Sequence, residues 1–133
     1  MNIFNIISGV FIGSGLLATI YLPANETILN KSQDLIDKHS ETINALIQCE
    51  SQGKETAINK NDGKIGVDSI NVLQFQYRTF RYYAEKYDLF SELDEADWMN
   101  RWNDSYSQKL VAATMIENET NWKSHWKICS KNL

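Results

Sequence analysis

The uncharged run at the amino terminus constrains this chain more than any other feature. The first 25 of its 133 residues carry no charged side chain, and the stretch from Ile6 to Leu22 is almost wholly apolar. A helix of roughly 20 apolar residues crosses the hydrocarbon core of a bilayer, so the run is just long enough to span one. It has no polar face of the kind that a soluble amphipathic helix presents. We therefore expect residues 1–24 to be directed to a membrane, with a buried core helix as the alternative.

The flanks of this run bear on whether it is removed. An ordinary signal peptide has a Lys or Arg before its apolar run, and this chain has none there. Leu22-Pro23-Ala24 is only a passable cleavage site. An uncleaved signal anchor is therefore favoured over a cleaved signal peptide. In both cases we expect residues 25–133 to form one domain outside the cytoplasm, in the periplasm or at the cell surface. A nucleic-acid-binding protein needs a basic stripe on its surface. The net charge of -4 argues against nucleic acid as a partner of this chain.

The chain has two cysteines, Cys49 and Cys129. Two thiols alone cannot complete a structural zinc site, so no metal is expected. In an exported chain a pair of cysteines predicts one disulfide. Two buried free thiols are the alternative.

Helical spacing of apolar residues begins soon after the uncharged run. It extends over about 32–49, with Ser32 as the expected N-cap and Gly53 as a natural stop. The stretch 54–68 is rich in turn residues, and the Asn-Asp-Gly at 61–63 predicts a tight turn that short strands would flank. A small hairpin region is therefore expected after the first helix.

The rest of the chain is again helical in pattern. Helices are expected from the N-cap Thr79, from the acidic cluster at 92–97, over Ser105–Ile116 and, as a last turn or short helix, over Trp122–Cys129. The whole pattern predicts a mainly α fold with a small hairpin region.

One carboxyl stands out by its position. Glu50 falls in the last turn of the first expected helix or just beyond it. A carboxyl at the end of an apolar helix is partly desolvated, which raises its pKa and keeps it protonated near neutral pH. A general acid for a glycosidic oxygen needs this property. Gln74 would place an amide beside the carboxyl, able to orient it or to bind a sugar.

The residues around Glu50 resemble a known family. Glu50-Ser51-Gln52-Gly53, a turn-rich loop, and Leu73-Gln74-Phe75 before Thr79-Phe80 look like the lytic transglycosylase branch of the lysozyme-like superfamily. The resemblance covers roughly Ile43 to Tyr87. The tail from Asn121 to Cys129, with its two Trp residues, is similar to the ends of small bacterial and phage-like members. This resemblance implies an α+β lysozyme-like domain over 25–133.

The resemblance also implies roles for single residues. Glu50 would be the catalytic acid and base, Ser51 would lie in the active site, and Gln74 would line the cleft. Asn71 stands near the position where the family usually has glycine, and Asn tolerates a left-handed backbone. Asn71 and Tyr83 are further expected to contact the substrate. The Ala-Tyr-Asn-Ala-Gly signature of many members is absent.

The expected function is cleavage of the β-1,4 bond between MurNAc and GlcNAc in peptidoglycan glycan strands, without a cofactor. The N-acetyl group of the substrate would assist Glu50, and attack by the muramyl 6-hydroxyl or by water remains open. Asp62 and Asp68 are the nearby candidates for a second carboxylate, as a two-carboxylate lysozyme would need. Two other classes of protein remain as alternatives. One is a catalytically inactive, membrane-tethered module for wall binding or assembly, and the other is a membrane protein that binds only a protein partner.

Overall fold

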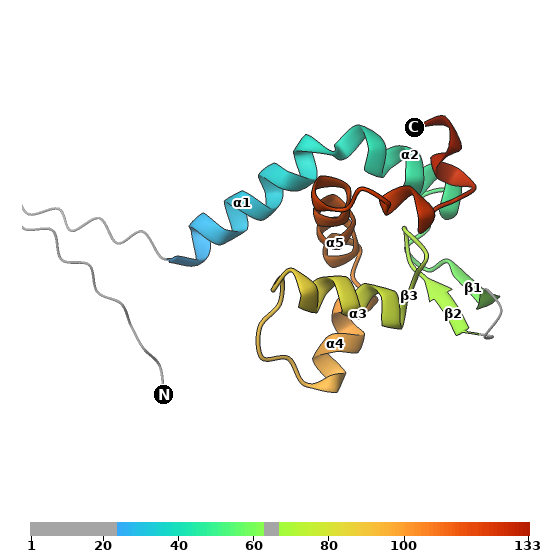
Figure 1. The fold of residues 1–133 in the computed structure, drawn as a ribbon. Helices are drawn as coiled ribbons and strands as arrows, with labels where there is room; N and C mark the ends of the chain where they lie inside the picture. The colour runs from blue at the N-terminus through green and yellow to red at the C-terminus, as the bar shows by residue number, and fades with distance from the viewer. Residues whose placement is uncertain (1–23, 63–66) are drawn as a thin grey trace, which may run out of the picture.

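A computed structural model describes residues 24–62 and 67–133 (Figure 1). Its elements, in chain order, are α1 (Ala24–Lys38), α2 (Ser40–Glu50), β1 (Ile58–Asp62), β2 (Val67–Ile70), β3 (Phe75–Gln76), α3 (Tyr77–Lys86), α4 (Glu95–Trp102), α5 (Ser105–Asn118) and the short 3-10 helices η1 (Trp122–Ser124) and η2 (Cys129–Asn132). The expected helical fold with a small antiparallel sheet is confirmed. Apart from Ala24, the expected membrane segment lies outside the described residues. Within the described ranges, no helix combines the length and the apolar character that crossing a bilayer requires.

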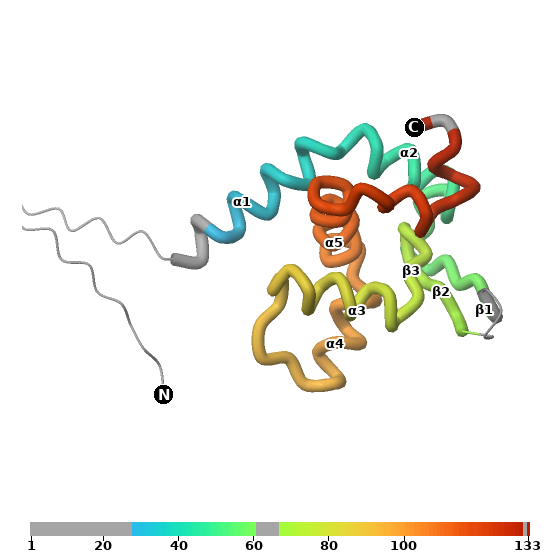
Figure 2. Tube along the Cα trace, in the orientation of Figure 1, coloured from blue at the N-terminus to red at the C-terminus, as the bar shows by residue number. Residues whose placement is uncertain are grey.

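The central element is α5, around which the other helices are arranged (Figures 1 and 2). Six consecutive residues, from Leu110 to Met115, are buried. Consecutive burial means that the helix is covered on all sides, as expected for a helix inside a core rather than on its surface. Helices α1 to α4 all pack against it. The core therefore lies between the paired amino-terminal helices and the α3–α4 pair.

The first helical stretch differs from the prediction. The helix begins at Ala24 instead of at Ser32, and the Ser32 hydroxyl donates to the Ile28 carbonyl oxygen inside α1 at 3.1 Å. The expected single helix over 32–49 also breaks at His39. At this break the His39 Nε2 lies 2.7 Å from a carboxylate oxygen of Glu117, at the end of α5. Ser32 as an N-cap was therefore wrong, and a contact from a distant helix accompanies the break.

The sheet has the order β1-β2-β3, with both neighbouring pairs antiparallel. β1 and β2 are the short strands expected here; Asn61 and Asp62, which were expected in the turn, instead end β1, and Gly63 lies outside the described residues. The connection from β2 to β3 begins at Asn71 and ends at Gln74, with φ values of 65° and 53°. The prediction of a left-handed Asn71 is thus confirmed. Its backbone N–H donates to the carbonyl oxygen of Ala57 at 2.8 Å, which holds this turn against the start of β1.

Two of the remaining helix starts agree with the sequence patterns. Asp94 caps α4 by accepting from the backbone N–H of Asp97, and Asp104 caps α5 in the same way. Thr79, in contrast, is not an N-cap. α3 begins two residues earlier, after Gln76, whose side chain makes no capping hydrogen bond.

Candidate active site

Glu50 is the last residue of α2, as the sequence predicted. The buried side chains of Ile43, Leu46 and Ile47 fix the helix against the core. Glu50 itself is half-buried and lines a hollow of about 380 Å³. We call this the Glu50 hollow; its other lining residues are Cys49, Ser51, Gln52, Lys54, Ala57, Ile58, Asn59 and Gln74. The structure therefore places the helix end and the start of the sheet around one polar depression.

Ser51 follows Glu50 directly and is buried. Its hydroxyl lies 2.8 Å from the carbonyl oxygen of Val72 and 3.1 Å from that of Ile47. A hydroxyl has one proton to donate, so these two acceptors share it. Ser51 lines the hollow, but its hydroxyl serves to join α2 to the loop before β3.

Gln74 lines the same hollow as Glu50, although 24 positions separate them in the sequence. Its side-chain amide donates to the carbonyl oxygens of Asn71, at 2.6 Å, and Ala57, at 3.2 Å. Its side-chain oxygen accepts from the hydroxyl of Ser69 at 3.2 Å. The amide thus braces the turn and the start of β1 at the wall of the hollow.

Asn71 does not line the Glu50 hollow within the described residues. Its side-chain oxygen accepts from the backbone N–H of Val72 at 2.5 Å and from the Ser105 hydroxyl at 2.9 Å. Its side-chain nitrogen donates to the carbonyl oxygen of Asn103 at 2.8 Å. These bonds tie the turn to the junction of α4 and α5 from a buried position. The expectation that Asn71 contacts the substrate stays a prediction.

Tyr83 lies elsewhere. It is buried on α3, and its hydroxyl shares a hydrogen bond of 2.8 Å with Nε2 of His125. Burial, with the negative charge of Glu119 as a smaller cause, raises the pKa of the Tyr83 hydroxyl. Burial also lowers the pKa of the His125 imidazole. The structure does not bring Tyr83 together with Glu50, and its role toward substrate stays a prediction.

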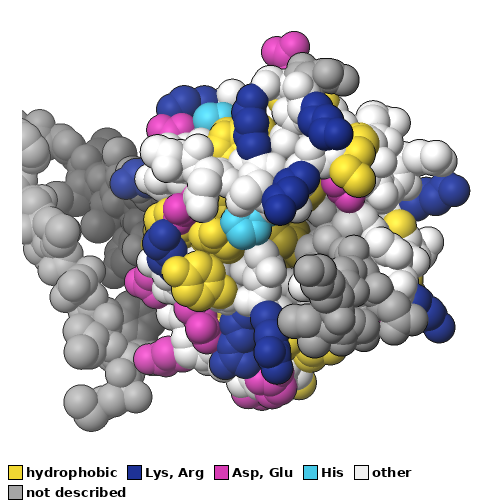
Figure 3. Space-filling model, turned by 45° about the vertical axis from the view of Figure 1, so that its right-hand side comes forward, with side chains coloured by type: hydrophobic (Ala, Val, Ile, Leu, Met, Phe, Trp, Pro, Cys, Tyr) yellow, Lys and Arg dark blue, Asp and Glu magenta, His cyan; other side chains and the backbone are white. Residues whose placement is uncertain are grey.

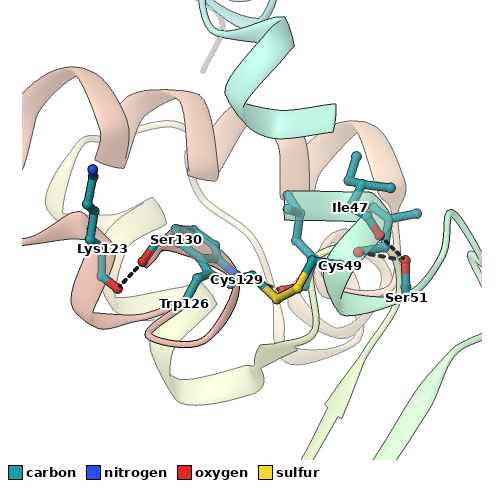
Figure 4. Close-up of a disulfide and its surroundings, with 9 residues drawn as sticks. Ile47, Cys49, Ser51, Lys123, Trp126, Cys129 and Ser130 are labelled. Atoms are coloured by element: carbon teal, nitrogen blue, oxygen red, sulfur yellow. Dashed lines mark hydrogen bonds between the residues drawn. A yellow bond between two sulfur atoms is a disulfide. The ribbon is translucent and has the colours of Figure 1, made fainter. Parts of the chain in front are cut away.

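The expected disulfide is present. Cys49 and Cys129 are bonded, with Cα atoms 5.6 Å apart, so the carboxyl-terminal segment is tied to the residue before Glu50 (Figure 4). Nearby, the indole N–H of Trp126 donates to the carbonyl oxygen of Leu73 at 3.0 Å. The same segment therefore holds both the end of α2 and the loop that carries Gln74.

Sequence reasoning missed Gln108, a fully buried residue of α5. Its side-chain oxygen accepts from the backbone N–H of Leu73 at 3.1 Å. Its side-chain nitrogen donates to the carbonyl oxygens of Ile70, at 3.0 Å, and Trp102, at 2.8 Å. Gln108 therefore fixes the β2–β3 connection from the core side. The signal in the sequence was a glutamine among the apolar residues of a central helix, which alone does not say what it binds.

Asp68 and Asp62 are the two candidates for a second carboxylate, and only the side chain of Asp68 lies within the described part of the chain. Asp68 is half-buried on β2 and is not among the described residues that line the Glu50 hollow. The side chain of Asp62 lies outside the described part. No group of three or more His, Cys, Asp or Glu residues suited to a metal ion occurs within the described ranges. Glu50 is therefore the carboxyl that the described geometry places in the hollow.

Comparisons with protein-family models, with curated proteins and with solved structures find no match to this chain.

Proposed function

We propose that this chain cleaves the β-1,4 glycosidic bond between N-acetylmuramic acid and N-acetylglucosamine in peptidoglycan, with Glu50 as its single general acid and base. The observation that carries the proposal is that Glu50 and Gln74 line the same hollow. These are the two residues that the resemblance to lytic transglycosylases singles out as acid and cleft residue. The substrate would be a glycan strand lying across the end of α2.

The reaction needs one carboxyl and a group that the substrate supplies. Protonated Glu50 gives its proton to the glycosidic oxygen as the bond to the anomeric carbon breaks. The carbonyl oxygen of the neighbouring N-acetyl group bonds to that carbon and takes up the developing positive charge. Glu50, now a carboxylate, then removes a proton from the attacking hydroxyl, whose oxygen bonds to the anomeric carbon as the bond from the N-acetyl oxygen to that carbon breaks. Attack by the muramyl 6-hydroxyl gives a 1,6-anhydro sugar, and attack by water gives a reducing end.

The charge distribution supports an anionic polymer as substrate. Residues 120–133 contain Lys123, Lys127 and Lys131 but no Asp or Glu, in a chain of net charge -4. Figure 3, which turns the right-hand side of Figure 1 forward, shows Lys and Arg side chains on this face together with hydrophobic ones and with Asp and Glu side chains, several of them toward its left and lower edges. Peptidoglycan carries carboxylates, so the basic segment 120–133 favours its approach despite the overall negative charge.

We further propose that the domain works outside the cytoplasm and that residues 1–24 hold it at the membrane. The support is the Cys49–Cys129 disulfide, because such bonds persist in oxidising compartments. A reporter that is active only in the periplasm, fused after residue 25, should be active in the membrane fraction. Cytosolic, soluble reporter would contradict this localisation.

The proposed activity is tested with the full chain, purified peptidoglycan and mass analysis of the released muropeptides. Glu50→Gln keeps the shape of the side chain but removes the acidic proton, so release should fall by about 10²–10⁴-fold. Glu41→Gln is the matched control, because Glu41 is an exposed carboxyl in the first turn of the same helix. Both variants should melt close to the wild type.

Each of the other outcomes would indicate a different mechanism or function for this chain. Near-normal release by folded Glu50→Gln would remove Glu50 from the mechanism. An equally deep loss in Asp62→Asn or Asp68→Asn would indicate a two-carboxylate lysozyme. Binding of glycan by the wild type without any release would indicate the non-catalytic wall-binding module.

A further inference from the structure

Residues 123–133, which we call the η2 tip, carry two exposed apolar side chains. Ile128 is 79% exposed and Leu133 is 41% exposed. The same stretch has no Asp or Glu, and it carries the exposed lysines Lys123, Lys127 and Lys131. Single exposed apolar residues are common on protein surfaces, so the exposure of Ile128 is informative only together with its surroundings. Two features of the tip supply these, a fixed backbone and the arrangement of its lysines.

The backbone around Ile128 is fixed because its neighbours point inward. The indole of Trp126 is buried and hydrogen-bonded, and Cys129 forms the disulfide described above. The hydroxyl of Ser130, also buried, donates to the carbonyl oxygen of Lys123 at 3.0 Å (Figure 4). Ile128 is therefore held outside the core by the residues on both sides of it. A partner would meet an apolar group that is already in place, which lowers the cost of binding.

Lysines lie on both sides of Ile128. Lys127 precedes it directly. Ile128 has helical backbone angles, φ -80° and ψ -52°, and leads into η2. Side chains three positions apart share one side of a 3-10 helix, which brings Lys131 to the side of Ile128. Within the described ranges, neither Lys127 nor Lys131 forms an ion pair with a carboxylate. The tip thus presents an aliphatic group between two cations.

An aliphatic group between cations fits the surface of an anionic lipid bilayer. The ammonium groups of lysines pair with anionic headgroups, while an apolar side chain enters the boundary of the acyl chains. A hydrated polyanion would pair with the lysines but would leave Ile128 in water. A second copy of the chain would bring lysines of equal charge together on the same face. The bilayer is therefore the occupant that uses both kinds of side chain.

We propose that the η2 tip is a second membrane contact, which inserts Ile128 into the surface of an anionic bilayer. The inference rests on the proposed function and on the proposed anchoring by residues 1–24. Anchoring raises the effective concentration of lipid at the tip, so a weak contact suffices. Each lysine near an anionic surface contributes a factor of about five to the binding constant, and burial of one isoleucine about tenfold or more.

This contact would determine where the Glu50 hollow works. Cys129 follows Ile128, and its bond to Cys49 holds the Cα atoms of the two cysteines 5.6 Å apart, directly before Glu50. A tip that is fixed at the bilayer therefore fixes the end of α2 close to the headgroups. The substrate of the proposed cleavage would be glycan strands that lie next to the membrane, rather than strands farther out in the wall.

The test reconstitutes the full chain in vesicles of phosphatidylcholine, with or without phosphatidylglycerol. Lysine amines are then acetylated, and the rate at each lysine is measured by mass spectrometry. Lys127 and Lys131 should react at least about fivefold more slowly in the anionic vesicles than in the neutral ones. Lys109, near the start of α5, is the internal control for effects of the vesicles on the reagent, and its rate should stay level.

Two substitutions separate the apolar and the charged parts of the contact. Ile128→Ser should return Lys127 and Lys131 to their rates in neutral vesicles, because a serine side chain gains nothing from leaving water. Met99→Ser is the matched control and should keep the protection. Met99 is 44% exposed on α4, which lies at the opposite end of the molecule from the tip (Figure 1). Lys127→Gln should weaken the protection of Lys131 by about fivefold.

The outcomes separate this inference from the proposals on which it rests. Equal rates in both kinds of vesicle would overturn it, as would protection that survives Ile128→Ser. Protection by purified peptidoglycan but not by vesicles would make glycan the occupant and also overturn it. Protection in a wild-type chain that releases no muropeptides would support the contact and contradict the cleavage reaction, and release without protection would do the reverse. A chain that binds anionic vesicles but stays in solution with neutral ones would support the tip and contradict the anchor.

Discussion

The hydroxyl of Ser51 donates a hydrogen bond of 2.8 Å to the carbonyl oxygen of Val72, and it joins the residue after Glu50 to the loop that ends in Gln74. Both partners are buried. The two sides of the Glu50 hollow are therefore linked by a bond between residues 21 positions apart.

Ser51→Ala should weaken this link. A buried carbonyl oxygen that loses its donor costs about 1–3 kcal/mol, so the free energy of unfolding in urea should fall by that order. Muropeptide release should also fall, because Gln74 and Glu50 are no longer held together. Ser124→Ala, at an exposed serine in η1, is the control. Unchanged stability in Ser51→Ala would show that the hydroxyl contributes nothing at this position.

Asn71 combines a left-handed backbone with three side-chain hydrogen bonds, which two substitutions can separate. Asn71→Gly keeps the backbone conformation but loses the bonds, and Asn71→Ala loses the bonds and adds backbone strain of about 1–2 kcal/mol. We expect both to be less stable than the wild type in chemical denaturation, with the alanine variant the weaker by about that amount. An alanine variant as stable as the glycine variant would show that the backbone conformation carries no cost.

The disulfide should contribute strongly to stability. Cys49 and Cys129 are 80 positions apart, and the chain-entropy model gives about 4–5 kcal/mol for closing a loop of this length. The double variant Cys49→Ser, Cys129→Ser should lose stability of that order in non-reducing urea. Wild-type protein treated with a reductant should behave in the same way, and this is the internal control. Equal unfolding curves for oxidised and reduced wild type would contradict the prediction.

Glu119 should make the stability of the fold depend on pH. Its hydrogen bonds to Lys86 first, and to Tyr87 second, lower the pKa of the Glu119 carboxyl below its ordinary value. A carboxyl whose folded pKa is lowered stabilises the fold above its unfolded pKa, and this stabilisation is lost as the pH falls through the folded pKa. Wild type should therefore melt above Glu119→Gln at neutral pH, and the difference should vanish in acid. A difference that is constant from pH 7 to pH 3 would show that charge is not its cause.

Local signals in the sequence predicted most elements and part of the site. The starts of α4 and α5 were predicted from such local signals, and Asp94 and Asp104 cap these helices by accepting from backbone N–H groups three residues away. The position of Glu50 at the end of α2 and the left-handed Asn71 are equally local. The disulfide could be predicted because the chain has only two cysteines.

Contacts between distant residues could not be predicted in this way. The break at His39 accompanies a hydrogen bond between His39 and Glu117, and the hydroxyl of Tyr83 shares a hydrogen bond with His125, 42 positions later. Gln108 reaches three backbone groups on separate elements. No periodicity in a single sequence records such partners, because they depend on how the elements pack. For the same reason the pattern did not suggest the internal bonds that occupy the amide of Gln74.

The bond between Cys49 and Cys129 also sets an order of events during synthesis. Glu50 leaves the ribosome with a reduced thiol as its neighbour, and this thiol has no partner until 80 further residues have been made. A chain interrupted anywhere in that interval carries the carboxyl, the sheet or α5 but not the covalent closure at the end of α2. Completion of the final segment is thus the step that converts an open chain into one whose candidate acid is fastened in place.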